Sequence, residues 1–286
     1  MSQLILRNLR LYFRDRAAVF FSFLSVLIVF AVYALFLGNN YIRGNEDIPG
    51  AKNLMDSWIM AGILAITGMS TTMGALGSMV DDHTRKISYD FYTSPVRRTR
   101  LAAGYLFSAL IIGIIMTVFS LIFSEVYIVA RGGALLPFGS ILKLLALIPV
   151  SVASSGSMCF LMVLFFKTQS SYSVASSIVG TLLGFLTGVY IPVGALSGQL
   201  QLVVKIFPVS YAASLFRKIM MEQAVSQSFA SAPAKARESF EGMMGITYQW
   251  NGTVISVQAS ILILLGVAAL FYVLAVVRLS AKKNIL

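Results

Sequence analysis

The chain has 286 residues, of which 58% are hydrophobic and only 12% are charged. Soluble domains carry about 25% charged residues, so this composition excludes an ordinary water-soluble protein. The formal net charge of +11 would suit nucleic acid, but most charges lie between long uncharged stretches, which argues against that partner. The uncharged stretches are Ala17–Ile42, Ser57–Val80, Leu101–Ser124, Leu144–Phe166, Thr168–Val204 and Gly242–Val277.

Each stretch is long enough to cross a bilayer, because about 20 apolar residues in a helix span the hydrocarbon core. A backbone in lipid has to satisfy its own hydrogen bonds, and these stretches do not alternate as barrel strands do, so we expect helices. The sequence therefore predicts an all-α polytopic membrane protein with six transmembrane helices in one domain, residues 1–286. The expected spans are about 18–37, 57–80, 101–130, 142–166, 172–192 and 254–277.

Basic residues favour one side of this arrangement. They lie before the first span, between the second and third, between the fourth and fifth, and after the sixth: Arg7, Arg10, Arg14, Arg16, Arg85, Lys86, Arg97, Arg98, Arg100, Lys167, Arg278, Lys282 and Lys283. Short cytoplasmic segments are rich in Lys and Arg. We therefore expect a multi-pass protein of the cell membrane with both termini in the cytoplasm. Anionic membrane lipids are the simplest partners for these cations.

The first 16 residues have the pattern of an interfacial amphipathic helix. Arg7, Arg10 and Arg14 share one face, while apolar residues such as Leu9 and Tyr12 share another. An ordinary basic flank that only fixes the topology is the alternative.

The polar segment 81–100 lies on the cytoplasmic side by the charge rule. Its pattern is compatible with a short helix over about 84–92, ended by Ser94 and Pro95, since the residue before a proline avoids the α region. Exposed aromatic residues on such a helix favour docking to another protein, whereas a solvated basic connector is the alternative. The candidate docking residues are Ile87, Tyr89, Phe91, Tyr92 and Pro95.

Two further sets of residues are candidates within the spans. Glu125 is a carboxylate deep within the third span, so it is a possible substrate or gate residue, although it lies near the outer end and could reach the interface. Gly180, Gly184 and Gly188 recur every four residues in the fifth span. That spacing places them on one helix face and suits close helix packing at a pore seam.

Residues 196–252 are expected outside the cell. Leu200–Phe207 and Tyr211–Met221 are predicted as two amphipathic helices, separated by Pro208, that lie at the interface or re-enter it. Arg217 and Lys218 are expected to reach water through their long side chains. Residues 222–250 are more polar and are expected to form a small external helix with Pro233 near its first turn.

The sequence offers little chemistry for an enzyme. No Gly-Lys pair occurs, so a phosphate-binding loop of the usual type is excluded. His83, the single histidine, lies beside Asp81 and Asp82, but three adjacent loop residues favour a solvated connector over a metal site. Cys159 is expected to be a packed core thiol. We therefore expect no catalytic, metal or cofactor site in this chain.

The chain resembles the permease subunits of type-2 ATP-binding-cassette exporters. The resemblance rests on the cytoplasmic run Thr93-Ser94-Pro95-Val96-Arg97-Arg98, which leads into the third span. It rests further on Gly188-Val189-Tyr190-Ile191-Pro192 and Phe207-Pro208-Val209-Ser210-Tyr211 around the end of the fifth span.

The resemblance implies a half-transporter. A second permease chain, identical or different, would complete the path, and two separate ATPase subunits would bind ATP and magnesium. Residues 84–96 would act as the coupling helix, helped by residues 4–16, and the first and fifth spans would line the seam. The cargo would be a drug, lipid, peptide or glycan. A stand-alone secondary transporter or channel, or a membrane scaffold or enzyme, are the alternatives.

Overall fold

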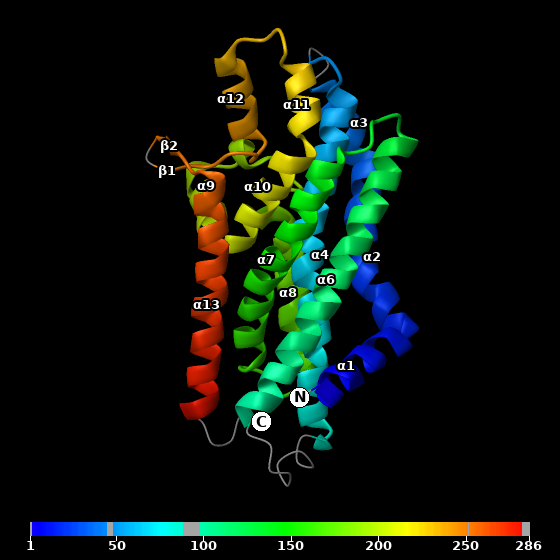
Figure 1. Cartoon of the computed structure of the whole chain (residues 1–286), viewed down its shortest axis with the longest axis vertical. Coiled ribbons are helices and arrows are strands. Elements are labelled where there is room, and N and C mark those ends of the chain that lie inside the picture. Colours follow the sequence, from blue (N-terminus) through cyan, green and yellow to red (C-terminus); the bar gives the residue numbers. More distant parts are fainter. Residues whose placement is uncertain (1, 45–47, 88–97, 251, 282–286) are drawn as a thin grey trace.

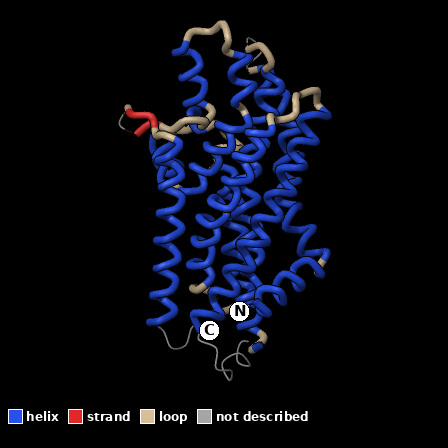
Figure 2. The backbone as a smooth tube through the Cα atoms, in the orientation of Figure 1, coloured by secondary structure: helices blue, strands red, loops and turns tan. Residues whose placement is uncertain are grey.

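The computed structural model describes residues 2–44, 48–87, 98–250 and 252–281, with the backbone alone for residues 18, 21–23, 25, 37, 39, 40, 98, 99 and 281. Helices dominate it, and loops gather at the two ends of a bundle (Figure 2). The helical elements are α1 (Ser2–Arg14), α2 (Arg16–Val32), the π-helical turn η1 (Tyr33–Leu37), α3 (Gly38–Arg43), α4 (Ala51–Thr84), α6 (Arg98–Ala130), α7 (Phe138–Val163), α8 (Gln169–Leu186), the 3₁₀ turn η2 (Val193–Ala195), α9 (Gly198–Ile206), α10 (Pro208–Met220), α11 (Glu222–Ser228), α12 (Ala234–Met243) and α13 (Val257–Ala281). Strands β1 (Gln249–Trp250) and β2 (Thr253–Val254) form a small antiparallel hairpin.

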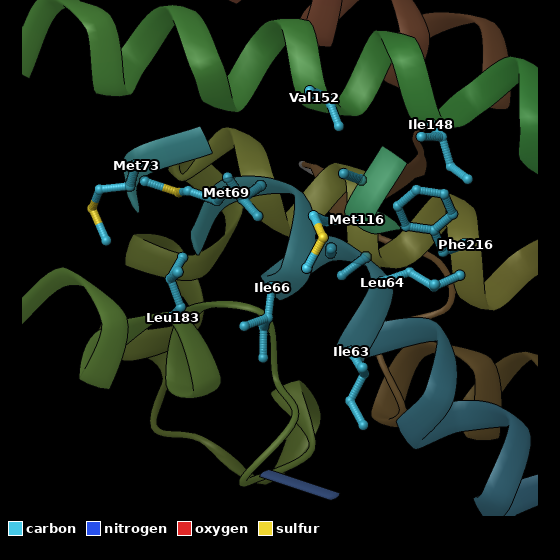
Figure 3. Close-up of a cluster of buried hydrophobic side chains, with 14 of the residues drawn as sticks. Ile63, Leu64, Ile66, Met69, Met73, Met116, Ile148, Val152, Leu183 and Phe216 are labelled. Carbon is cyan, nitrogen blue, oxygen red and sulfur yellow. The ribbon is translucent and has the colours of Figure 1, made fainter. Parts of the chain in front are cut away.

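Helix α4 is the centre of the bundle. It packs against α2, α6, α7, α8 and α10, and 89% of its most apolar stretch is buried. A helix that is apolar on all sides is expected to be surrounded. In the core, side chains from five helices meet (Figure 3): Ile63, Leu64, Ile66, Met69, Met73, Met116, Ile148, Val152, Leu183 and Phe216.

Four of the described helices are individually long and apolar enough to cross a membrane: α4, α6 from Arg100, α7, and α13 to Ser280. Helices α9 and α10 pass the same test only as a pair, bent by 89°, so they form a broken span or a re-entrant loop. Val26–Phe36 is a shorter apolar helix. These four or five spans agree with an all-α membrane protein.

The boundaries of the first two spans differ from those that the charge pattern predicted. The helix that begins with α2 continues through η1 and α3 to Arg43, and α4 begins at Ala51. The polar loop expected from Gly38 to Asp56 is therefore shorter than predicted. Helix α4 includes Asp56 because the carboxylate of this residue is buried and hydrogen-bonded, as described below.

Helices α9–α12 and the hairpin lie at the end of the bundle opposite α1, whereas α1 and the C-terminal end of α13 lie at the same end (Figure 1). The expected pair of short helices around Pro208 is confirmed, with Pro208 as the first residue of α10. The helix expected near Pro233 is also confirmed, since α12 begins directly after Pro233; its place outside the cell stays a prediction.

Candidate functional site

A hollow follows one face of α4, bounded by α2 and α8 in its upper part and mainly by α1 in its lower part. Its upper part, nearer to α9, has a volume of about 570 Å³ and is floored by Ile66 and Gly74 of α4. Its lower part, about 760 Å³, continues along α4 past Gly77 to Asp82. Tyr12 and Gly74 line both parts, and we call the whole hollow the α4 groove.

The two parts of the α4 groove differ in chemistry. None of the described residues that line the upper part is charged. Its apolar lining includes Ile28, Val29, Ile66, Met73 and Leu183. Its hydroxyl groups come from Ser70, Ser176, Ser177, Thr181, Tyr12 and Tyr190. The lower part is lined by ionisable residues of both signs: Arg14, Asp15, Asp81, Asp82 and Arg85. A mostly apolar hollow with a charged end suits an amphiphilic molecule.

Small residues of α8 make room for the groove. A Cβ added at Gly180 would meet nothing within 4 Å, whereas one at Gly184 would overlap the ring of Tyr190. The hydroxyls of Ser177 and Thr181 donate to carbonyls of their own helix at 2.9 and 3.0 Å. These hydroxyls are therefore satisfied without a ligand, as is common for Ser and Thr in helices.

Gly188 has a different place from Gly180 and Gly184, because α8 ends at Leu186. The amide of Val189 donates to Gly184 O at 2.8 Å and that of Gly188 to Phe185 O at 3.0 Å, while Gly188 has φ +68°. This is a Schellman cap, in which a left-handed glycine ends the helix. The three glycines therefore do not share one face of α8.

Arg217 of α10 lies beside this cap and is fully buried, at 0% exposure. Its Nη2 donates to Gly188 O at 3.1 Å, and its guanidinium lies 4.9 Å from the centroid of the Trp58 ring. Added Cβ atoms at Gly62 and Gly245 would each lie 3.2 Å from the guanidinium nitrogens. Within the described parts of the chain no carboxylate pairs with Arg217, and Nε and Nη1 have no hydrogen-bond partner.

The expectation that Arg217 reaches water is thus wrong, although Lys218 is exposed as predicted. The reason is that α10 packs against α4, α7 and α13, which leaves water on only one side of the helix. An indole ring and a free carbonyl replace part of the lost hydration of the guanidinium.

At the opposite end, α1 is fastened to the bundle by Asp82 of α4. Arg7 donates to both oxygens of Asp82, at 2.7 and 2.9 Å, and the hydroxyl of Tyr105 donates to one of them at 2.5 Å. The side chain of Asn8 donates to Ser108 Oγ at 3.1 Å. These five residues form what we call the α1 clamp.

The two sides of the clamp differ in exposure, which is 7% for the Asp82 side chain and 32% for that of Arg7. The hydrogen bond with Asp82 raises the pKa of Arg7 above its ordinary value. Leu4 packs so closely on α6 that a Cβ at Gly104 would lie 2.5 Å from its Cδ2. Helix α1 is therefore held by both charge and close packing.

Of the proposed coupling residues, the structure describes Ile87, which lies just beyond the clamp. Helix α4 continues to Thr84 and ends in a turn at Arg85 and Lys86, where Lys86 has φ +62°. Ile87 follows this turn and is half-buried. The other candidates, Tyr89, Phe91, Tyr92 and Pro95, lie outside the described residues.

Two further acids are buried at the end of the bundle near α3 and α11. Asp56, at 1% exposure, accepts from Tyr33 at 3.1 Å and from Arg131 Nε at 3.3 Å. Glu125 accepts from the backbone amide of Leu136 at 3.1 Å, and so it ties the α6–α7 connection to α6. Neither acid is among the described residues that line the α4 groove.

Sequence reasoning missed the α1 clamp and the burial of Arg217. Asp82 carried a usable signal, because a carboxylate directly after an apolar run needs a cation, and Arg7 faces the same side of the membrane. Arg217 carried no comparable signal, since its surroundings come from distant segments at Trp58, Gly188 and Gly245. The structure places Gly180 and Gly184 on the groove but Gly188 and Glu125 elsewhere.

A bundle of long apolar helices with a half-open, amphiphilic hollow on one side is the architecture of a polytopic membrane protein and suits a transporter. The chain matches the family model described as ABC-2 type transporter over residues 1–221. It therefore belongs to the ABC-2 type transporter family and is a membrane permease component of such a transporter. A comparison with curated proteins gave no match.

Proposed function

We propose that this permease is half of an ATP-driven exporter that moves a hydrophobic or amphiphilic molecule, such as a drug, lipid, peptide or glycan, out of the cell. The observation that carries the proposal is the α4 groove. Its uncharged upper part and charged lower end match the two halves of an amphiphile. Ile66 and Met73, which line it from α4, belong to the buried core, so the α4 side of the groove is a fixed feature of the bundle.

The proposed path needs a second permease chain. Helix α8 has its main contacts with α4 and α9, and α2 has its main contacts with α4 and its own neighbours in sequence. Apolar side chains of α8 point away from the bundle and are exposed: Val174, Ile178, Leu182 and Phe185. A second copy, or a related chain, that packs on α2 and α8 would bury this surface and close the groove, with Gly180 and Gly184 at the seam.

We propose six spans in the cell membrane, with α2–η1 and α8 added to α4, α6, α7 and α13. Helix α8 has 18 residues, close to the lower limit for a span, where the bilayer thins to match a short helix. The bent pair α9–α10 would then re-enter the outer face. Because α1 and the end of α13 lie together (Figure 1), six crossings leave both termini in the cytoplasm, where the basic residues belong.

Two copies of a separate ATPase would supply the energy and bind ATP and magnesium. The coupling residues Ile87, Tyr89, Phe91, Tyr92 and Pro95 would dock in them, next to the α1 clamp. Closure of the ATPases would shift the permease between inward and outward states through its different contacts in each state. This arrangement requires no buried proton relay, in contrast to a secondary transporter or channel.

The α4 groove can be tested by filling it. Gly180→Trp places a large ring where an added Cβ meets nothing within 4 Å, so we expect ATP-dependent transport in proteoliposomes to fall at least tenfold. Gly266→Trp is the matched control, because Gly266 also has open space around it and lies on α13, away from the groove. Equal transport by the two variants would contradict the assigned path.

The ATPase requirement has its own test. An affinity-tagged chain is expected to retain an ATPase subunit on purification, and Tyr89→Ala with Phe91→Ala is expected to abolish transport while leaving the bundle folded. If the purified chain alone accumulates cargo in liposomes, the secondary-transporter alternative is correct.

A further inference from the structure

A second hollow lies at the end of the bundle opposite α1. It has a volume of about 640 Å³ and is bounded by α7, α10, α11, α12 and α13, and α12 lies at that end in Figure 1. It shares no lining residue with the described walls of the α4 groove. We call it the outer cavity, and it is not needed for the proposed function.

The floor of the outer cavity is apolar and well packed. Leu147, Leu215, Val225 and Ile246 line it, and each is at most 6% exposed. The volume falls within the range of about 300–1,000 Å³ that is typical of small-molecule sites. The cavity therefore has the size and lining to take a hydrocarbon chain.

The outer cavity is bounded on one side by the exposed apolar helix α13. Val257, the first residue of α13, and Ile261, one turn further, line it. Only 17% of the most apolar stretch of α13 is buried, and Leu262 and Leu265, at 67% and 46% exposure, continue the apolar surface beyond Ile261. An acyl chain in the cavity would thus be continuous with the surrounding lipid.

The rim of the outer cavity carries an excess positive charge. Lys143 lies 3.7 Å from Glu222, and Arg237 lies 2.8 Å from Glu241, so each carboxylate has a cation. Lys218 also lines the rim, is exposed, and has no ion pair within the described parts of the chain. The charge that is left over is suited to a negative headgroup.

We propose that the outer cavity binds an anionic phospholipid, with an acyl chain on the Leu147–Leu215 floor and the headgroup phosphate at Lys218 and Lys143. A cation close to an anionic headgroup strengthens binding about fivefold, and the apolar floor supplies affinity that does not depend on the headgroup. The bound lipid would contact α7, α10 and α13 at the end of the bundle opposite α1, where the apolar spans meet the more polar helices α11 and α12.

The test is native mass spectrometry of the full-length protein with phosphatidylglycerol or phosphatidylcholine of identical acyl chains. We expect at least fivefold preferential retention of phosphatidylglycerol, and we expect Lys218→Gln to remove most of that preference. Lys235→Gln is the matched control: Lys235 is an exposed cation of α12 at the same end that does not line the outer cavity. Equal retention of the two lipids by the unaltered protein, or an equal effect of the two lysine variants, would overturn the proposal.

The acyl chain is tested separately. Ala146 is exposed and lines the cavity, so Ala146→Trp fills it from a position that tolerates size, and we expect it to lower retention of both lipids at least fivefold. Ala269→Trp, at an exposed position of α13 outside the cavity, should leave retention unchanged. Retention that survives Ala146→Trp would place the lipid elsewhere and overturn the assignment.

Discussion

Replacing Arg7 by alanine should release α1 from the bundle far more than replacing Asp82 by asparagine. The Asp82 side chain is 7% exposed, and without Arg7 its carboxylate keeps the hydroxyl of Tyr105 as its one side-chain donor among the described residues. Removing one partner of a buried ion pair costs about 3–5 kcal/mol. Because the Arg7 side chain is 32% exposed, we expect the lower end, about 3 kcal/mol.

Asp82→Asn has a different consequence. The freed Arg7 can turn toward water, and the asparagine oxygen can still accept from Tyr105, so we expect a loss of only about 1 kcal/mol, as for exposed pairs. The double variant should be less damaging than the sum of the two single ones, because it leaves no buried carboxylate behind.

Hydrogen exchange of the α1 amides in the full-length protein measures this difference directly. At a factor of ten per 1.4 kcal/mol, Arg7→Ala should speed exchange in α1 about 100-fold and Asp82→Asn about fivefold, while amides of α7 stay unchanged. Arg10→Ala, at an exposed position on the same helix, is the control and should have little effect. A larger effect for Asp82→Asn than for Arg7→Ala would refute the reasoning.

Three further predictions concern thermal melting of the purified protein in detergent. Arg217→Lys should lower the stability by about 2 kcal/mol and more than Arg217→Met, because lysine keeps the buried charge but loses the planar contact with the tryptophan ring; a more stable lysine variant would contradict this account. Gly188→Ala should cost about 1–2 kcal/mol, since alanine is strained at φ +68°; an unchanged melting temperature would exclude the cap. Gly113→Val should cost about 2–3 kcal/mol, because a Cβ there would overlap Thr72 and push α6 from α4. The control Gly266→Val, on the open side of α13, should cost less than 1 kcal/mol. Similar losses of stability for the two variants would refute the close approach of α6 to α4.

The long spans were predictable because charge is expensive in hydrocarbon. The uncharged stretches 57–80 and 101–124 lie inside α4 and α6, and 144–166 lies inside α7 up to Val163, since a helix in lipid can extend only as far as its side chains avoid an unpaired charge. The turn around Pro208 was predictable for a local reason, as proline fits the first turn of a helix but not its interior.

The expectation that charged residues mark the ends of helices fails where a charged side chain is bonded inside the bundle. Asp56 lies within α4 and Arg217 within α10, at 1% and 0% exposure, although the sequence marked Asp56 as the end of a loop and Arg217 as water-facing. Their partners, such as Tyr33 and Trp58, come from other helices, and no local pattern reveals them. Gly188 was misplaced for a related reason, because four-residue spacing does not distinguish a helix face from a left-handed cap.

The same contacts suggest which parts of the bundle move. Asp56 and Asp82 lie near opposite ends of α4, about 39 Å apart at 1.5 Å per residue, and both are bonded to neighbouring helices. Helix α4 contains no proline and packs with α6, α7 and α10. We therefore expect it to move as a rigid body, together with the floor of the groove. Helices α2 and α8, the two sides of the groove, have their main contacts with α4 and with elements at their own ends. The α4 groove can therefore widen or close by displacement of α2 or α8 while α6, α7 and α10 stay packed on α4, as the proposed exporter requires for alternate exposure of its cargo to the two sides of the membrane.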